Sequence, residues 1–154
     1  MIRQRITEGA ILEIPIEGGY YIYAQILLGK LGYAFFDFKS KDKLLNLEVL
    51  KTKKVLFILM VYNDVITKGH WLKVGKLDVR EDLKVQPNKF IHHKGEIPEF
   101  KLYNPNTGEI TNGSREQVIG LECAAVWEAN HVEDRIRDHY LGVPCIWMEG
   151  MEIK

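Results

Sequence analysis

The sequence contains few of the residues on which disulfide scaffolds and hydrolase sites depend. It has two cysteines, Cys123 and Cys145, and two serines, Ser40 and Ser114, among 154 residues. A small secreted domain held by disulfides would use more cysteine, so we expect reduced thiols buried in apolar surroundings. Neither serine lies in a Gly-x-Ser-x-Gly turn. These scarcities argue against a disulfide framework and against a serine hydrolase.

Metal-binding spacings are also lacking. No His-Glu-x-x-His or Cys-x-x-Cys pattern is present among the five histidines and two cysteines. His131 and His139 are eight residues apart, about two helical turns, which is too far for one ion. We therefore expect no metal, no cofactor and no enzymatic activity. A small thiol hydrolase built on Cys145 and His139 remains a second alternative.

Long apolar runs are missing as well. The longest, Val55–Tyr62, is far too short to cross a bilayer. The N-terminus has no apolar core of a signal peptide. The simplest expected location is the cytoplasm.

The chain has no net charge, with 21 basic and 21 acidic residues. A general nucleic-acid binder usually carries a basic excess, so this balance disfavours direct nucleic-acid binding. The charge is uneven, since residues 1–78 carry +4 and residues 79–154 carry −4. This asymmetry is explained either by chance or by an acidic C-terminal surface that binds a basic partner.

Hydrophobic patterning predicts a strand-rich first half. Alternation predicts strands over Ile11–Ile16, Tyr20–Leu28 and Tyr33–Phe38, joined by glycine turns. The unbroken apolar run Val55–Tyr62 predicts a central strand covered on both faces. Trp71–Gly75 reads as another short strand.

The middle of the chain is less regular. Residues 78–99 have little periodicity and are expected to form a long loop. Residues 100–110 predict a small hairpin around Asn104–Thr107. Residues 115–127 are ambiguous: Ser114 and Gln117 match a helix capping box, but the apolar run to Trp127 also suits a strand.

Two aromatic residues and a lysine-rich segment define the first alternative function. Lys39–Lys54 is expected to be an edge strand or short helix with a solvated lysine face, or an anion-binding patch. Tyr21 and Tyr23 point away from the face of the first hairpin that forms the core. They either pack under the C-terminal helix or stack bases, as in a nucleic-acid- or ligand-binding small β-barrel.

The clearest element is a C-terminal helix over Asn130–Leu141. Asn130 is a suitable N-cap, and Glu133 occupies the third helical position of a capping box. Gly142 suits the C′ position. A single apolar stripe recurs every four residues, formed by Val132, Ile136 and Tyr140.

This helix also carries the candidate partner-binding residues. On the predicted register, Asp134, Arg137 and Asp138 point to solvent, with Glu128 and Glu133 nearby. An acidic patch of this kind would steer and select a basic partner. No catalytic residues are assigned.

Three segments resemble the immunity protein 26 family of bacterial polymorphic-toxin systems. They are Gly9–Ile26, Gly69–Lys76, and a C-terminal segment made of Leu121–Trp127, His131–Ile136 and Asp138–Gly142. The resemblance implies a β-rich α+β fold, no enzymatic activity, and neutralisation of a toxin encoded nearby. It identifies neither the toxin nor the residues that bind it.

The combined expectation is a single α+β domain over residues 1–154. It has a mainly antiparallel, strongly bent sheet or partly open barrel, with the C-terminal helix packed on it. The expected function is that of a cytoplasmic immunity protein, which neutralises a cognate polymorphic or contact-dependent toxin by covering its active or substrate-binding surface. If the toxin is a nuclease, its basic groove would suit an acidic patch.

Overall fold

The computed structural model describes residues 3–29, 31–93, 99–149 and 151–153 and contains two sheets. The larger sheet is formed by β1 (Ala10–Ile16), β2 (Tyr20–Ile26), β3 (Tyr33–Phe36), β4 (Val55–Val61), β5 (Leu72–Lys76) and β9 (Val126–Trp127). The smaller sheet is formed by β6 (Lys89–His93), β7 (Glu99–Tyr103) and β8 (Ile110–Gly113). The helices are α1 (Asp64–Thr67), α2 (Arg115–Val118) and α3 (Ala129–Leu141), with 3₁₀ turns η1 (Leu47–Thr52), η2 (Glu81–Leu83) and η3 (Ile146–Met148).

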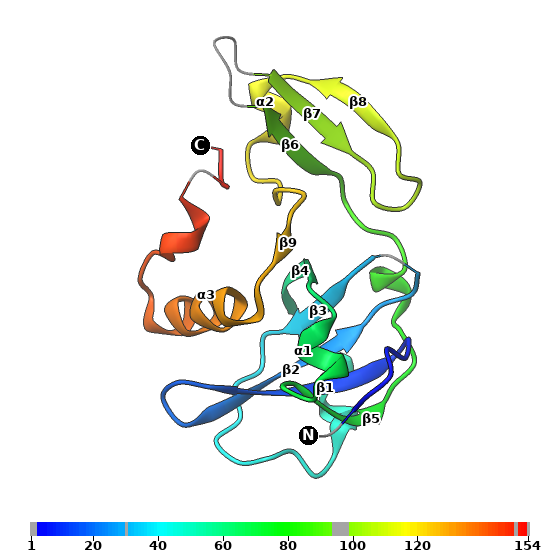
Figure 1. Ribbon diagram of the computed structural model, residues 1–154, viewed down its shortest axis with the longest axis vertical. Coiled ribbons are helices and arrows are strands. Elements are labelled where there is room, and N and C mark those ends of the chain that lie inside the picture. The colour runs from blue at the N-terminus through cyan, green and yellow to red at the C-terminus, as the bar shows by residue number, and fades with distance from the viewer. Residues whose placement is uncertain (1–2, 30, 94–98, 150, 154) are drawn as a thin grey trace.

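The six-stranded sheet has the order β5-β1-β2-β3-β4-β9 and is antiparallel except for the short parallel pair β4–β9. Strands β5 and β9 form its edges, so the sheet is open and does not close into a barrel. The three-stranded sheet lies at the other end of the molecule, and α3 lies beside β9 (Figure 1). The expected α+β fold with a C-terminal helix on the sheet is confirmed.

Alternation in β2 separates the two faces of the large sheet. Tyr20, Ile22 and Ala24 join the core that includes Val132 and Ile136 of α3. This core also contains the buried side chains of α1, and it is the main site of apolar burial in the fold. The apolar stripe of α3 therefore packs as its spacing predicts.

The lysine-rich segment covers the opposite face of the sheet. It forms the 3₁₀ turn η1, in agreement with a short helix, and its Leu50 packs on Tyr23. The Tyr23 hydroxyl donates a hydrogen bond to Glu13 and accepts one from the Leu44 N–H. Burial, more than any other influence, raises the pKa of Tyr23 to about 12. Tyr23 is thus a core residue under η1, not under α3 and not on a surface that bases could reach.

Several local expectations need correction or completion. Residues 78–99 contain the strand β6, where we expected a long loop; residues 94–98 of that segment lie outside the described part. The hairpin is confirmed as β7–β8. Both interpretations of 115–127 hold in part, because the Ser114–Gln117 capping box opens α2 and Trp127 lies in β9.

The boundaries of α3 differ from the expectation at one end. Its N-cap is Glu128 rather than Asn130, and no side chain caps the helix there. Asn130 is exposed in the first turn. The C-terminal end is as expected: Gly142 is left-handed with φ 70°, and its N–H bonds the carbonyls of Asp138 and His139.

Gly32 shows how a glycine brings two strands together. It has a φ of 95°, and a Cβ there would lie 2.6 Å from the Leu59 carbonyl oxygen of β4. Only glycine allows both the backbone conformation and this approach. In the described residues, no helix has the length and apolar character needed to span a membrane.

The assignment of residues to the core or the surface can be tested with the same substitution, leucine to alanine, at a buried and an exposed position. Leu12 is fully buried, whereas the side chain of Leu45 is fully exposed. Leu12→Ala should lower the free energy of unfolding by about 2–5 kcal/mol because it leaves a cavity. Leu45→Ala should change it by less than about 0.5 kcal/mol. Urea unfolding followed by tryptophan fluorescence measures both; equal effects would contradict the packing described.

Candidate functional site

A polar cleft of about 380 Å³ lies where the first turn of α3 meets α1 and the residues before β5. It is lined by Pro15, Asp64, Val65, His70, Trp71, Glu128, Ala129, Asn130 and Glu133, and we call it the acidic cleft. Three of these side chains are carboxylates. Among the described lining residues there is no lysine or arginine, and His70 is the one ionisable group that can carry positive charge.

Trp71 fixes the position of the innermost carboxylate. Its indole is buried against Phe35, with ring centroids 5.8 Å apart and nearly perpendicular planes. The indole N–H donates a hydrogen bond of 3.3 Å to Oε2 of Glu133. The buried side chain of Trp71 therefore holds Glu133, which forms one wall of the cleft.

Burial raises the pKa of Glu133 above its ordinary value. The hydrogen bond from Trp71 lowers this pKa, the charge of Asp134 raises it, and His70 lowers it. The net direction is upward because half-burial disfavours the ionised carboxyl. A positively charged group that entered the cleft would favour the ionised form of Glu133 and so lower its pKa again.

The other carboxylates of the cleft are accessible. Asp64 and Glu128 are both exposed. Asp64 lies 3.8 Å from the ammonium of Lys68, and this pair is more than half exposed, so it holds Asp64 weakly. The acidic cleft thus combines one fixed, half-buried carboxylate with two exposed ones.

The remaining candidate residues of α3 form an internal ion-pair cluster. Arg137 bonds Asp134 and Asp138 at 3.1 Å, and Glu17 at 3.2 Å. Asp138 is only 7% exposed. The expectation that Asp134, Arg137 and Asp138 all point freely to solvent is therefore wrong, because Arg137 pairs with both carboxylates and Asp138 is buried.

The five candidate residues consequently separate into two groups. Glu128 and Glu133 line the acidic cleft, whereas Asp134 and Asp138 share the guanidinium of Arg137 outside it. Sequence reasoning missed Asp64 and His70. His70 could have been noticed because it lies in the Gly69–Lys76 segment that resembles the family, whereas no sequence feature marked Asp64.

An aromatic stack lies beside the cleft. His131 and Trp147 are stacked with centroids 3.6 Å apart, and Trp147 donates its indole N–H to Asp134 at 2.8 Å. Trp147 is 37% exposed, whereas Trp71 and Trp127 are buried. The Trp127 indole N–H has no hydrogen-bond partner among the described residues. The stacked rings of His131 and Trp147 therefore form an aromatic surface next to the acidic cleft.

The thiol alternative gains no support from the geometry. Cys145 is partly exposed and His139 is exposed, and no hydrogen bond joins them in the described structure. Cys123 is also only partly buried, so the expectation of fully buried thiols is wrong. The described residues contain no group of three His, Cys, Asp or Glu side chains arranged to hold a metal ion.

Comparison with known families assigns this chain to a family. The family described as immunity protein 26 matches residues 7–98, which is more than half of the chain. This chain belongs to the immunity protein 26 family. No curated protein and no solved structure matches it.

The family match covers only part of the acidic cleft. Asp64, His70 and Trp71 lie within the matched residues, whereas Glu128 and Glu133 of α3 lie beyond them. The Gly9–Ile26 and Gly69–Lys76 segments are inside the match, and Leu121–Gly142 is outside. One wall of the cleft in this immunity-family protein therefore lies within the family match, and the wall formed by α3 lies outside it.

Glu133 should leave a pH signature on stability. A carboxyl whose pKa is higher in the folded state stabilises the fold at low pH, and this contribution is lost as pH rises through the folded pKa. Glu133→Gln removes that loss but keeps an acceptor for Trp71. Its free energy of unfolding, relative to wild type, should therefore increase from pH 4 to pH 7 in urea titrations.

The control for loss of one negative charge is Glu109→Gln, because Glu109 is exposed and is not one of the cleft residues. A Glu133→Gln difference that is flat with pH, or that falls as pH rises, would contradict the stated burial of Glu133.

Proposed function

We propose that this protein neutralises a cognate toxin of a polymorphic or contact-dependent system by binding it in the cytoplasm and covering its active or substrate-binding surface. The observation that carries the proposal is membership of the immunity protein 26 family. Neutralisation by occlusion requires a rigid, complementary surface and no chemistry of its own.

The acidic cleft is the surface that we propose meets the toxin. Three carboxylates converge there without a lysine or arginine among the described lining residues, and Trp71 holds Glu133 in place. A lysine or arginine of the toxin would pair with Asp64 and Glu128 at the rim. Its charge would also favour ionised Glu133 inside. The cleft therefore suits a basic side chain.

A nuclease toxin would fit this surface. The substrate groove of a nuclease is basic because it binds phosphates, so an acidic cleft would steer the two proteins together. Steering of this kind acts mainly on the association rate and weakens with salt. The ion-pair cluster of Arg137 would contribute less, since its guanidinium already bonds Asp134 and Asp138 and offsets part of their charge.

Charge reversal at the rim tests the proposal. The partner for this test is the toxin domain that we expect a neighbouring gene to encode. Asp64→Lys/Glu128→Lys should lower its association rate at least about tenfold at low salt, and should reduce the salt dependence of that rate. Stopped-flow or surface-plasmon measurements at several salt concentrations provide the readout.

The matched control is Glu109→Lys/Glu116→Lys, which makes the same charge change at exposed positions in the β8–α2 region. Urea unfolding of both variants checks the fold. If the rim variant associates as fast as wild type, the acidic cleft is not the toxin-binding surface. If the two variants slow association equally, the effect is one of net charge and the cleft again has no special role.

A further inference from the structure

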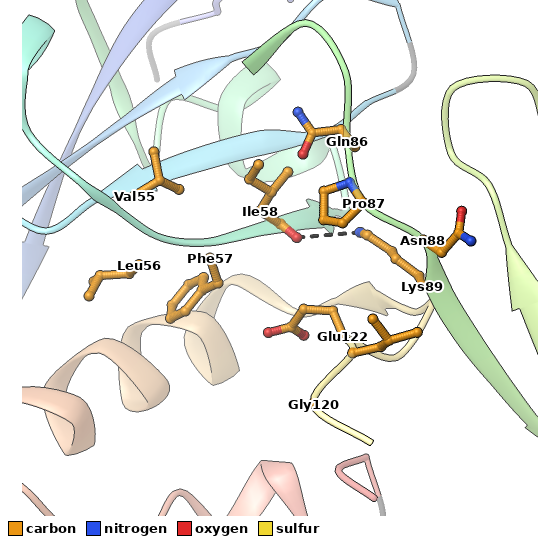
Figure 2. A pocket seen from close by; sticks show the side chains of 11 residues that line it. Val55, Leu56, Phe57, Ile58, Gln86, Pro87, Asn88, Lys89, Gly120 and Glu122 are labelled. Carbon is orange, nitrogen blue, oxygen red and sulfur yellow. Dashed lines mark hydrogen bonds between the residues drawn. The ribbon is translucent and has the colours of Figure 1, made fainter. Parts of the chain in front are cut away.

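A second surface lies at the outer edge of β4. Strand β9 pairs with β4 only at Met60 and Val61, so the β-ladder on that side does not continue along Val55–Leu59. A groove of about 440 Å³ occupies this position instead. Its walls are β4 residues Val55–Ile58, the segment Gln86–Lys89 and the segment Gly120–Glu122 (Figure 2).

The groove is mostly apolar but contains one buried ammonium. Lys89 is 7% exposed, and Figure 2 shows its amine directed at the edge of β4. Its one hydrogen bond in the described structure is a long one, 3.3 Å to the Ile58 carbonyl. An ammonium has three donors, so Lys89 retains donor capacity inside the groove.

The nearest carboxylate does not neutralise Lys89. Glu122 also lines the groove, but both of its oxygens are bonded by the guanidinium of Arg135. Arg135 in turn packs over Phe57, 4.1 Å from the ring centroid. Lys89, Arg135 and Glu122 thus form a local group with one positive charge in excess.

Burial opposes that charge. Burial lowers the pKa of Lys89, the charges of Glu122 and Cys123 raise it, and the charge of Arg135 lowers it. A buried cation that bonds no carboxylate is costly, and an incoming carboxylate would offset the cost with a charge-assisted hydrogen bond. The charge in this groove therefore selects an anionic ligand, opposite in sign to the ligand of the acidic cleft.

The shape of the groove indicates a chain segment. A strand edge recognises an extended peptide through main-chain hydrogen bonds, while side pockets select its side chains. Val55–Leu59 spans about 13 Å at about 3.3 Å per residue, which matches a few residues of extended chain. A small free carboxylate would satisfy Lys89 but would leave the apolar walls uncovered.

We propose that the β4-edge groove binds an extended peptide segment whose acidic residue pairs with Lys89. The segment belongs to a protein partner, and the proposal does not depend on the acidic cleft. Its failure would leave the cleft hypothesis unaffected, and failure of the cleft hypothesis would leave this groove unaffected.

The experiment is selection of random linear dodecapeptides on phage against the full chain, followed by ¹⁵N NMR titration with the enriched peptides. Enriched peptides should share an acidic residue and shift the amides of Val55–Ile58 and Gly120–Glu122. Replacing that acidic residue with its amide should weaken binding at least tenfold. Lys89→Met should have the same effect, whereas Lys101→Met, on β7, should leave affinity unchanged.

Several results would overturn the proposal. They are absence of enriched peptides, shifts confined to other surfaces, equal binding of acid and amide peptides, and unchanged affinity of Lys89→Met. Displacement of the peptide by acetate at equal concentration would assign the site to a small carboxylate. Concentration-dependent dimerisation with the same shifts would assign it to a second copy of the chain. The acid-to-amide comparison uses wild-type protein, so the test remains decisive if Lys89→Met fails to fold.

Discussion

The burial of Trp71 is the constraint on which most of this structure depends. Its indole fills the core against Phe35, and its N–H reaches Glu133 of α3. Its backbone N–H donates a hydrogen bond to the Val65 carbonyl of α1, and its carbonyl accepts one from the Gln4 side chain. One residue therefore joins the N-terminal segment, α1, the sheet and α3, and it forms one wall of the acidic cleft.

This arrangement places α3 between two surfaces of opposite charge. Glu133 faces the acidic cleft, while Arg135, about 200° further around the helix, pairs with Glu122 at the β4-edge groove. The helix is anchored to the sheet by Val132 and Ile136 on a third side. The charged side chains of α3 are consequently assigned to distinct neighbours, and few of them are free to act as a general acidic patch.

The sequence predicted those features that depend on local periodicity. Alternation in β2 and the four-residue spacing of Val132 and Ile136 both indicated the buried faces, because burial of a stripe or a strand face leaves a regular pattern. Gly142 indicated the end of α3 because a left-handed residue there favours glycine.

The sequence could not predict features that depend on distant partners. Asp138 lies on a nominally polar face, yet its pairing with Arg137 and the tertiary packing bury it. Asp64 and Glu128 converge although 64 residues separate them in the chain. Lys89 is buried in a segment without periodicity, so nothing local distinguished it from a surface lysine. Candidate sites built from one helix therefore recovered only the α3 side of the cleft.

The most direct test of the central claim is amide hydrogen exchange of the protein alone and in complex with its cognate toxin domain. If the acidic cleft is the toxin-binding surface, exchange should slow on complex formation in residues 64–71 and 128–133. Unchanged exchange in both segments, with protection confined to other parts of the chain, would contradict the account.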